Sequence, residues 1–119
     1  MLIEARVIAH LTACMTGCLV AAEVPETFPN DAALVIVSRL GGGTENKIRR
    51  ARLAVQSYGK TLLEAAERNE AAISALSTLT ADPVVSACRV ETSYIFSDEA
   101  RKRPRYQSIV HVTYYETED

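Results

Sequence analysis

Aromatic residues and cysteines are scarce in this chain of 119 residues. Tryptophan is absent and Phe28 and Phe96 are the only phenylalanines, so aliphatic side chains and alanine must form most of the core. The cysteines, Cys14, Cys18 and Cys88, are odd in number, whereas a disulfide-stabilised secreted domain has an even and denser set. We therefore expect three buried, reduced thiols, two of them on one helix face.

The sequence also lacks a charge excess and a long apolar run. The net charge of −2 excludes the strong overall field that drives nucleic-acid binding. Leu11-Thr12-Ala13-Cys14 is similar to a lipoprotein cleavage site, but Glu4 and His10 interrupt the apolar stretch around it. That stretch is too broken for a signal peptide or a membrane span, so we expect an uncleaved first helix and no membrane partner.

The length fits one domain over residues 1–119. Apolar residues spaced by three and four predict a first helix that ends near Gly17. They are Ile3, Val7, Ile8, Leu11, Met15 and Cys18. A loop rich in turn formers follows over 21–32, and Leu34-Val35-Ile36-Val37 is typical of a buried strand.

Two hairpins and a second helix are predicted after this strand. Gly41-Gly42-Gly43 favours a long hairpin loop over 41–46, before an alternating strand over 47–58. Thr61 and Glu64 have the spacing of a capping box at the start of a helix, which ends before Asp82-Pro83. Strands are expected over 84–96 and 106–115, with a charged connection over 97–104 and a frayed tail over 116–119.

These elements predict an α+β fold in the order α-β-β-α-β-β. The simplest arrangement is a mainly antiparallel four-stranded sheet with both helices packed on one face. The other face is then polar and meets solvent or a partner.

No pattern in the sequence indicates catalysis. His10 and His111 have no evident nucleophile or orienting partner, and we expect His111 on the face opposite Val110 and Val112. The glycine run lacks the Gly-Lys-Ser/Thr of a phosphate loop. Glu64, Glu67 and Glu70 suit a solvated helix face, and the scattered Cys and His residues do not suit zinc. We therefore predict no catalytic residues, no metal and no cofactor.

Two clusters of basic residues are the candidate contact sites. One lies on the second predicted strand and the other in the last connection, and each can be a solvated surface or a contact with DNA phosphates or an acidic subunit. The candidate residues are Arg50, Arg52, Arg101, Lys102, Arg103 and Arg105.

Several segments resemble the tail terminator proteins of long-tailed bacteriophages, also called minor tail or minor capsid proteins. These segments run from Val24-Pro25 to Pro29, from Leu34 to Gly42, from Arg52 to Gly59, through Glu64-Ala65-Ala66-Glu67, and from Tyr94 to Gln107. The resemblance covers nearly the whole chain in element order.

The resemblance implies a structural virion protein and no enzyme. Such proteins form a ring, usually a hexamer, at the head-proximal end of the tail tube. The ring stops tube polymerisation and joins the filled head through a connector or neck protein. The expected partners are thus other copies of the chain, the tube protein, the neck protein and genome DNA passing through without sequence readout. The location is the virion, after assembly in the host cytoplasm.

Three alternatives stay open at this stage. A head-closure or neck protein of the same virion uses the same kind of surface. A small non-viral ligand-binding module or enzyme predicts a concave apolar pocket with convergent polar groups. A bacterial nucleic-acid-binding protein using the Arg50/Arg52 face predicts strongly salt-dependent DNA affinity, against which the near-neutral charge argues.

Overall fold

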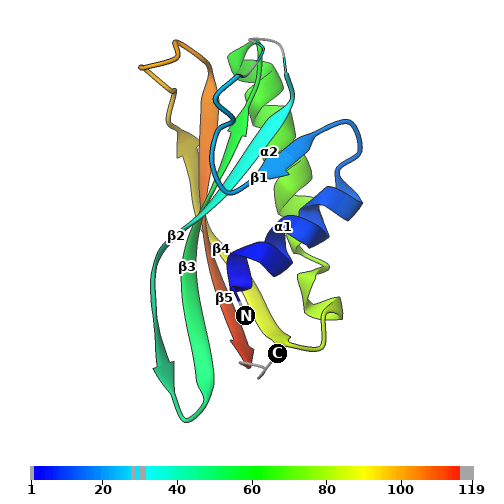
Figure 1. The fold of residues 1–119 in the computed structure, drawn as a ribbon, viewed down its shortest axis with the longest axis vertical. Coiled ribbons are helices and arrows are strands. Elements are labelled where there is room, and N and C mark those ends of the chain that lie inside the picture. The colour runs from blue at the N-terminus through cyan, green and yellow to red at the C-terminus, as the bar shows by residue number, and fades with distance from the viewer. Residues whose placement is uncertain (1, 28, 30–31, 116–119) are drawn as a thin grey trace.

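The chain forms an α+β fold with a five-stranded mixed sheet (Figure 1). The computed structural model describes residues 2–27, 29 and 32–115. Its elements are α1 (Ile3–Cys14), β1 (Leu19–Ala21), β2 (Leu34–Glu45), β3 (Ile48–Tyr58), α2 (Leu62–Leu76), the 3-10 helix η1 (Leu79–Ala81), β4 (Val85–Ile95) and β5 (Arg105–Tyr115). The strand order is β1-β2-β3-β5-β4.

The prediction of four strands is wrong because it omits β1. This strand runs parallel to β2, with Leu19 opposite Leu34 and Ala21 opposite Ile36. The two predicted hairpins are present, since β2 with β3 and β4 with β5 are antiparallel, and β3 pairs with β5 to join them. A strand of three residues is too short to show a period, so its pairing with β2 rather than its own sequence defines it.

The first helix is shorter than predicted. It ends at Cys14, where the backbone N–H of Met15 donates to the Leu11 carbonyl, and Gly17 then takes a φ of +74°. Positive φ favours glycine, which explains the reversal that leads into β1. Because Cys18 lies beyond the helix, Cys14 and Cys18 do not share a helix face. Cys14 is exposed and the other two cysteines are half-buried, so the prediction of three buried thiols is also wrong, although all three are free.

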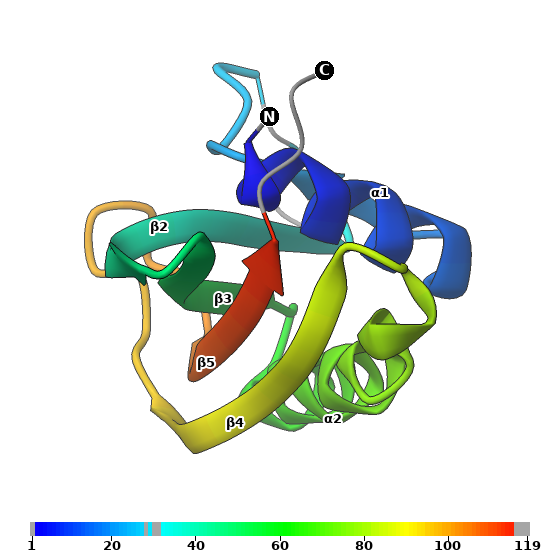
Figure 2. The same ribbon diagram turned by 90° about the horizontal axis from the view of Figure 1, so that it is seen from below.

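Both helices pack against the same apolar core. Ile3, Val7 and Leu11 of α1 and Ala72 and Leu76 of α2 belong to one buried cluster. Met15, Ala75 and Leu79 also belong to it, and the sheet supplies the remaining members: Val20, Val35, Val37, Ala51, Leu53, Val55, Val85, Val110, Val112 and Tyr114. The helices lie on the same side of the curved sheet (Figure 2), with α1 over β1 and β2 and α2 over β3 and β5. The opposite face of the sheet is left without a helix.

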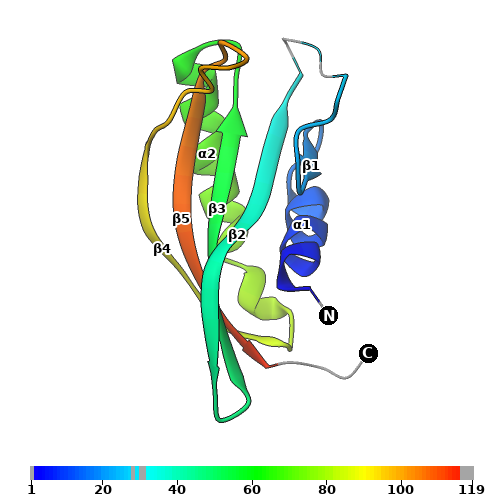
Figure 3. The ribbon, with the colours of Figure 1, turned by 60° about the vertical axis from the view of Figure 1, so that its left-hand side comes forward.

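The glycine run lies inside β2 rather than in a hairpin loop, which corrects the predicted loop over 41–46. β2 and β3 stay paired from Gly41 to Glu45 after a register shift, and the turn is Asn46-Lys47. The φ angles there are 51° and 68°, as in the two-residue turns that match strand twist. The two strands therefore form a long arm that projects at one end of the molecule (Figure 3).

Two of the expectations from the sequence lie partly or wholly outside the described residues. These are the frayed tail over 116–119 and positions 28, 30 and 31 of the loop over 21–32. None of the described helices has the length and apolar content needed to cross a membrane.

Candidate functional site

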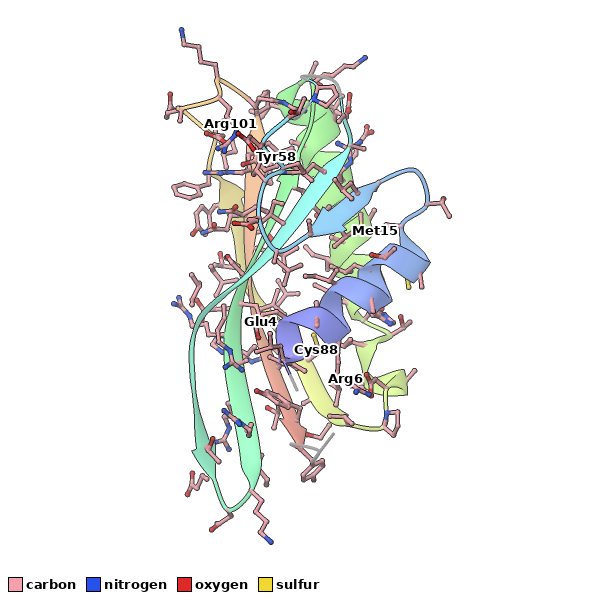
Figure 4. All side chains as sticks on the ribbon, in the orientation of Figure 1. Glu4, Arg6, Met15, Tyr58, Cys88 and Arg101 are labelled. Carbon is pink, nitrogen blue, oxygen red and sulfur yellow. The ribbon has the colours of Figure 1, made fainter. Side chains whose placement is uncertain are left out.

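A buried carboxylate organises the loop over 97–104 and the start of β5, which together carry four of the six candidate basic residues. Asp98 is only 5% exposed. Its Oδ2 accepts a hydrogen bond from Tyr58 Oη at 2.8 Å and one from Arg101 Nη1 at 3.0 Å. The Arg101 backbone N–H donates to Oδ1 at 3.1 Å, and Arg105 Nη1 lies 3.7 Å from Oδ2. Tyr58 and Arg101 are labelled at this end of the sheet in Figure 4. We call Tyr58, Asp98, Arg101, Arg103 and Arg105 the apical cluster.

Arg103 and Arg105 act within the chain. Arg103 is 4% exposed, and its two terminal nitrogens donate to the carbonyls of Pro29 and Ala32 at 3.3 and 3.2 Å. Its guanidinium lies 5.5 Å from the centre of the Tyr58 ring. Arg105 donates to Tyr58 Oη at 2.9 Å and to the Phe96 carbonyl at 2.7 Å. These contacts tie two loops to the end of the sheet.

Arg101 and Lys102 are the members of this basic run that face outward. The Arg101 side chain is 49% exposed although it pairs with Asp98. Lys102 is exposed and has a φ of 52°, which places it at the tight turn of the loop. The prediction of interface or DNA contacts thus stays open for these two residues, while burial leaves Arg103 and Arg105 little surface to offer.

The electrostatics of the apical cluster favour the ionised carboxylate. Burial raises the pKa of Asp98, but the hydrogen bonds from Tyr58 and Arg101 together outweigh it, so the pKa lies below its ordinary value of 3.8. Burial and the hydrogen bond to Asp98 raise the pKa of the Tyr58 phenol. Asp98 therefore stays charged and Tyr58 stays a donor near neutral pH.

The second predicted group lies on the helix-free face of the sheet. Arg50 Nη1 is 3.7 Å from Glu45 Oε2, and Arg52 Nη2 is 3.8 Å from Glu91 Oε2. His111, directly opposite Arg52 across the strand pair, contacts Glu91 through Nε2 at 2.6 Å. Hydrogen bonding to His111 lowers the pKa of Glu91. His111 lies opposite Arg52, on the face away from Val110 and Val112, as the sequence predicts.

The structure does not bring the two predicted groups together. Arg52 and Tyr58 are six positions apart on β3, which corresponds to about 20 Å along a strand. Instead, Arg89 of β4 lies opposite His111 and joins Arg52 and Glu91. The sequence analysis missed Arg89 and Glu91, because the only signal for them is the register between β4 and β5.

No arrangement among the described residues supports catalysis or metal binding. His10 Nε2 lies 2.8 Å from the Ala75 carbonyl, which accepts its proton, so this nitrogen is not a base for Cys14 at 3.7 Å. Burial raises the pKa of Cys88 to about 11, which suppresses its thiolate. No group of three or more metal-ligating side chains occurs in the described part of the chain.

An open hollow of about 390 Å³ lies between the end of α1 and the start of α2. Cys14, Cys18, Glu67 and Arg68 are among its lining residues. The Arg68 guanidinium donates to the Tyr58 carbonyl and to Glu64, so it serves the fold. The hollow is thus unlike the apolar pocket with convergent polar groups that a ligand-binding module predicts.

Comparison with known proteins gives no family for this chain. No protein-family model matches it, and no curated protein is significantly similar to it.

Proposed function

We propose that this protein is a structural component of a phage virion, a tail terminator that caps the tail tube as a ring. The ring stops tube growth and provides the surface to which the head joins through its neck. The role is binding by surface and symmetry, with no catalytic step. The resemblance of the segments around Leu34–Gly42 and Tyr94–Gln107 to that family is the first support.

The observation that carries the proposal is the placement of two protruding segments at opposite ends of the long axis. The turn that joins β2 and β3 lies beyond the end of β5 at one end of the molecule, and the loop over 97–104 lies at the other end (Figure 1). The molecule is 43 Å long and about 25 Å wide. A protein that joins a tube to a neck needs two separate contact regions facing away from each other, and this shape supplies them.

The two ends of the molecule differ in how they are stabilised, which supports a different binding role for each end. The apical cluster fixes the loop over 97–104, so this end presents Arg101 and Lys102 from a rigid base. In the arm, β3 pairs with β5 as far as Ile48, while β2 beyond Gly41 pairs with β3 and carries exposed side chains. A rigid end suits docking onto a preformed surface, whereas an extended arm suits contact with a neighbouring subunit.

The experiment starts with the mass of the purified protein by light scattering over a wide concentration range, followed by electron microscopy of any large species. A closed ring is expected. Tubes polymerised from the tail-tube protein of the same genome are then mixed with the protein, and their ends are imaged. Caps on the tube ends and arrested elongation are the expected results. Tubes that elongate without caps would overturn the proposal, and binding only to purified portal or neck rings would favour the head-closure alternative.

A further inference from the structure

The last strand of the sheet ends beside the turn of the arm. Tyr115, the last residue of β5, lies opposite Ile48, the first residue of β3. The Tyr115 backbone N–H donates to the Val84 carbonyl at 2.9 Å on the other side. Figure 3 shows this end of β5 next to the arm. Contacts on both sides of Tyr115 therefore fix the point from which the chain continues.

The two segments that meet at this point carry opposite charges. Residues 45–50, which we call the arm tip, hold three basic residues and one acidic residue, Glu45. The basic residues are Lys47, Arg49 and Arg50. The chain after Tyr115 continues, outside the described residues, with the acidic tail over 116–119, which holds three carboxylates in four positions. These are Glu116, Glu118 and Asp119. The acidic tail thus starts next to a segment with an excess of positive charge.

The basic residues of the arm tip lie within reach of the acidic tail. Four residues extend over at most about 14 Å. Arg49 and Arg50 are one and two positions from Ile48 along β3, which corresponds to about 3 and 7 Å, and Lys47 is one position away on the other side. At physiological ionic strength charges are screened over about 8 Å, so charges at these separations still attract each other.

The exposure of the arm tip favours a contact with further carboxylates. Lys47 is exposed at the turn. The Arg50 side chain is 63% exposed, and its pair with Glu45 at 3.7 Å leaves room for a second carboxylate. One exposed ion pair contributes little, but several opposite charges at short distance act together. The arm tip is therefore a suitable surface for the acidic tail.

The other side of Tyr115 is less suitable. The nearest basic residue of known pairing there is Arg6, whose guanidinium donates two hydrogen bonds to Asp82 at 2.7 and 2.8 Å. Asp82 compensates this charge, and its own carboxylate repels other carboxylates. The two sides of Tyr115 thus differ in charge, and the difference directs the tail toward the arm.

We infer that the acidic tail docks on the arm tip and shields its positive charge from other polyanions. The tail is joined to Tyr115, so its effective concentration at the arm tip is high, and a competing anionic partner must displace it. The tail thus lowers the affinity of the arm for such a partner. This inference goes beyond the proposed function and does not depend on it.

Two variants with the same net charge test the inference. The tail variant, Glu116→Gln with Glu118→Gln and Asp119→Asn, neutralises the tail without shortening it. The control variant removes three exposed carboxylates from α2 and from the loop over 97–104. Its substitutions are Glu67→Gln, Glu70→Gln and Glu99→Gln. Circular dichroism and urea unfolding establish that both variants are folded.

Docking is measured without any partner, from the backbone amide chemical shifts of the isotope-labelled protein. Relative to wild type, the amides from Lys47 to Arg50 should shift in the tail variant and stay unchanged in the control variant. Shifts confined to Tyr115, or shifts at Arg6 and Val84 in place of the arm tip, would overturn the docking.

Shielding is measured as the affinity for a short DNA duplex, by fluorescence anisotropy at physiological salt. The tail variant should bind at least about threefold more tightly than the control variant. Adding Arg49→Ala and Arg50→Ala to both should remove this difference. Equal affinities of the two variants, no DNA binding by the tail variant, or a difference that persists without the two arginines would overturn the shielding. Neither measurement uses a ring or a tube, so the proposed function is judged separately.

Discussion

Tyr58 Oη donates a 2.8 Å hydrogen bond to Asp98 Oδ2, across 40 residues of sequence. The contact joins the end of β3 to the loop that precedes β5. Because Arg101 and Arg105 also approach Asp98, the carboxylate is the common partner of three side chains. The outward direction of Lys102 at the loop tip therefore depends on one buried charge.

Asp98→Asn should destabilise the protein. The substitution removes the charge that compensates Arg101 and Arg105 while Tyr58 stays buried, and breaking a buried pair of this kind costs about 2–4 kcal/mol. Urea unfolding followed by circular dichroism measures the free energy of unfolding. Glu99→Gln is the matched control, because Glu99 is the exposed neighbour and should change it by less than about 0.5 kcal/mol. Equal effects of the two substitutions would contradict a structural role for Asp98.

Because of Asp98, we expect the free energy of unfolding to fall at acidic pH. The pKa of Asp98 is lowered in the folded protein, so its stabilisation is present above the ordinary value of 3.8 and is lost as the pH falls through the folded pKa. Hydrogen bonds from Arg6 lower the pKa of Asp82 in the same direction. The free energy of unfolding should therefore fall below about pH 4, and Asp98→Asn should lose less of it over that range than wild type. Parallel curves for the two proteins would refute this linkage.

Glycine at position 47 should stabilise the turn between β2 and β3. Lys47 has a φ of 68°, a conformation that costs a residue with a side chain about 1 kcal/mol. Lys47→Gly should raise the free energy of unfolding by about 0.5–1 kcal/mol, since Asn-Gly is the preferred pair for this turn. Lys47→Ala removes the same charge but keeps the strained φ, so it should give no gain in thermal unfolding. A gain from alanine as large as that from glycine would point to charge instead of backbone conformation.

Two buried serines should respond in opposite directions to alanine. The Ser57 hydroxyl oxygen is buried without a hydrogen-bond partner, so Ser57→Ala should leave stability unchanged or raise it by about 1 kcal/mol. Ser108 Oγ donates to Asn69 Oδ1 at 2.6 Å in the core, so Ser108→Ala should lower stability by about 1–2 kcal/mol. Urea unfolding of both variants in parallel checks this. Destabilisation by Ser57→Ala as large as that by Ser108→Ala would be the contrary outcome.

The long periodic elements could be predicted from the sequence. The N-cap of α2 at Thr61 is confirmed, since Thr61 Oγ1 accepts from the Glu64 N–H at 3.1 Å, whereas the Glu64 carboxylate pairs with Arg68. The β3 and β5 strands have an apolar face that alternates as expected, because Leu53 and Val110 both belong to the core cluster. By contrast, β1 depends on its pairing with β2. The glycine run predicts a loop because glycine is rare in strands, yet the turn begins three positions after Gly43, at Asn46-Lys47.

The candidate site could be predicted only in part. Arg101, Lys102, Arg103 and Arg105 look alike in sequence, but Arg103 is buried and Lys102 is exposed. What separates them is the position of the Tyr58 ring and of Asp98, and no local pattern encodes this distant contact. The alternation of apolar and basic residues along β3 is sufficient to predict that Arg50 and Arg52 lie on the exposed face, because a regular strand fixes the face on which each side chain lies.

If Arg50 and Arg52 contact DNA, the binding should be weak and should not depend on the DNA sequence. Both side chains are about half-exposed or more, at 63% and 47%, but Arg52 lies near Glu91, which offsets part of its charge. Binding of two unrelated DNA duplexes, measured by fluorescence anisotropy at several salt concentrations, should give equal affinities. Arg50→Ala with Arg52→Ala should reduce the slope of log affinity against log salt by about 2, as expected for two lost phosphate contacts. Lys60→Ala, which removes an exposed charge elsewhere, should leave the slope unchanged. If the slope of the double variant equals that of wild type, this face is not a DNA contact. A preference for one duplex would indicate base readout, which we do not expect, because among the described residues the surface around Arg50 and Arg52 is polar and has no aromatic side chains on which bases could stack.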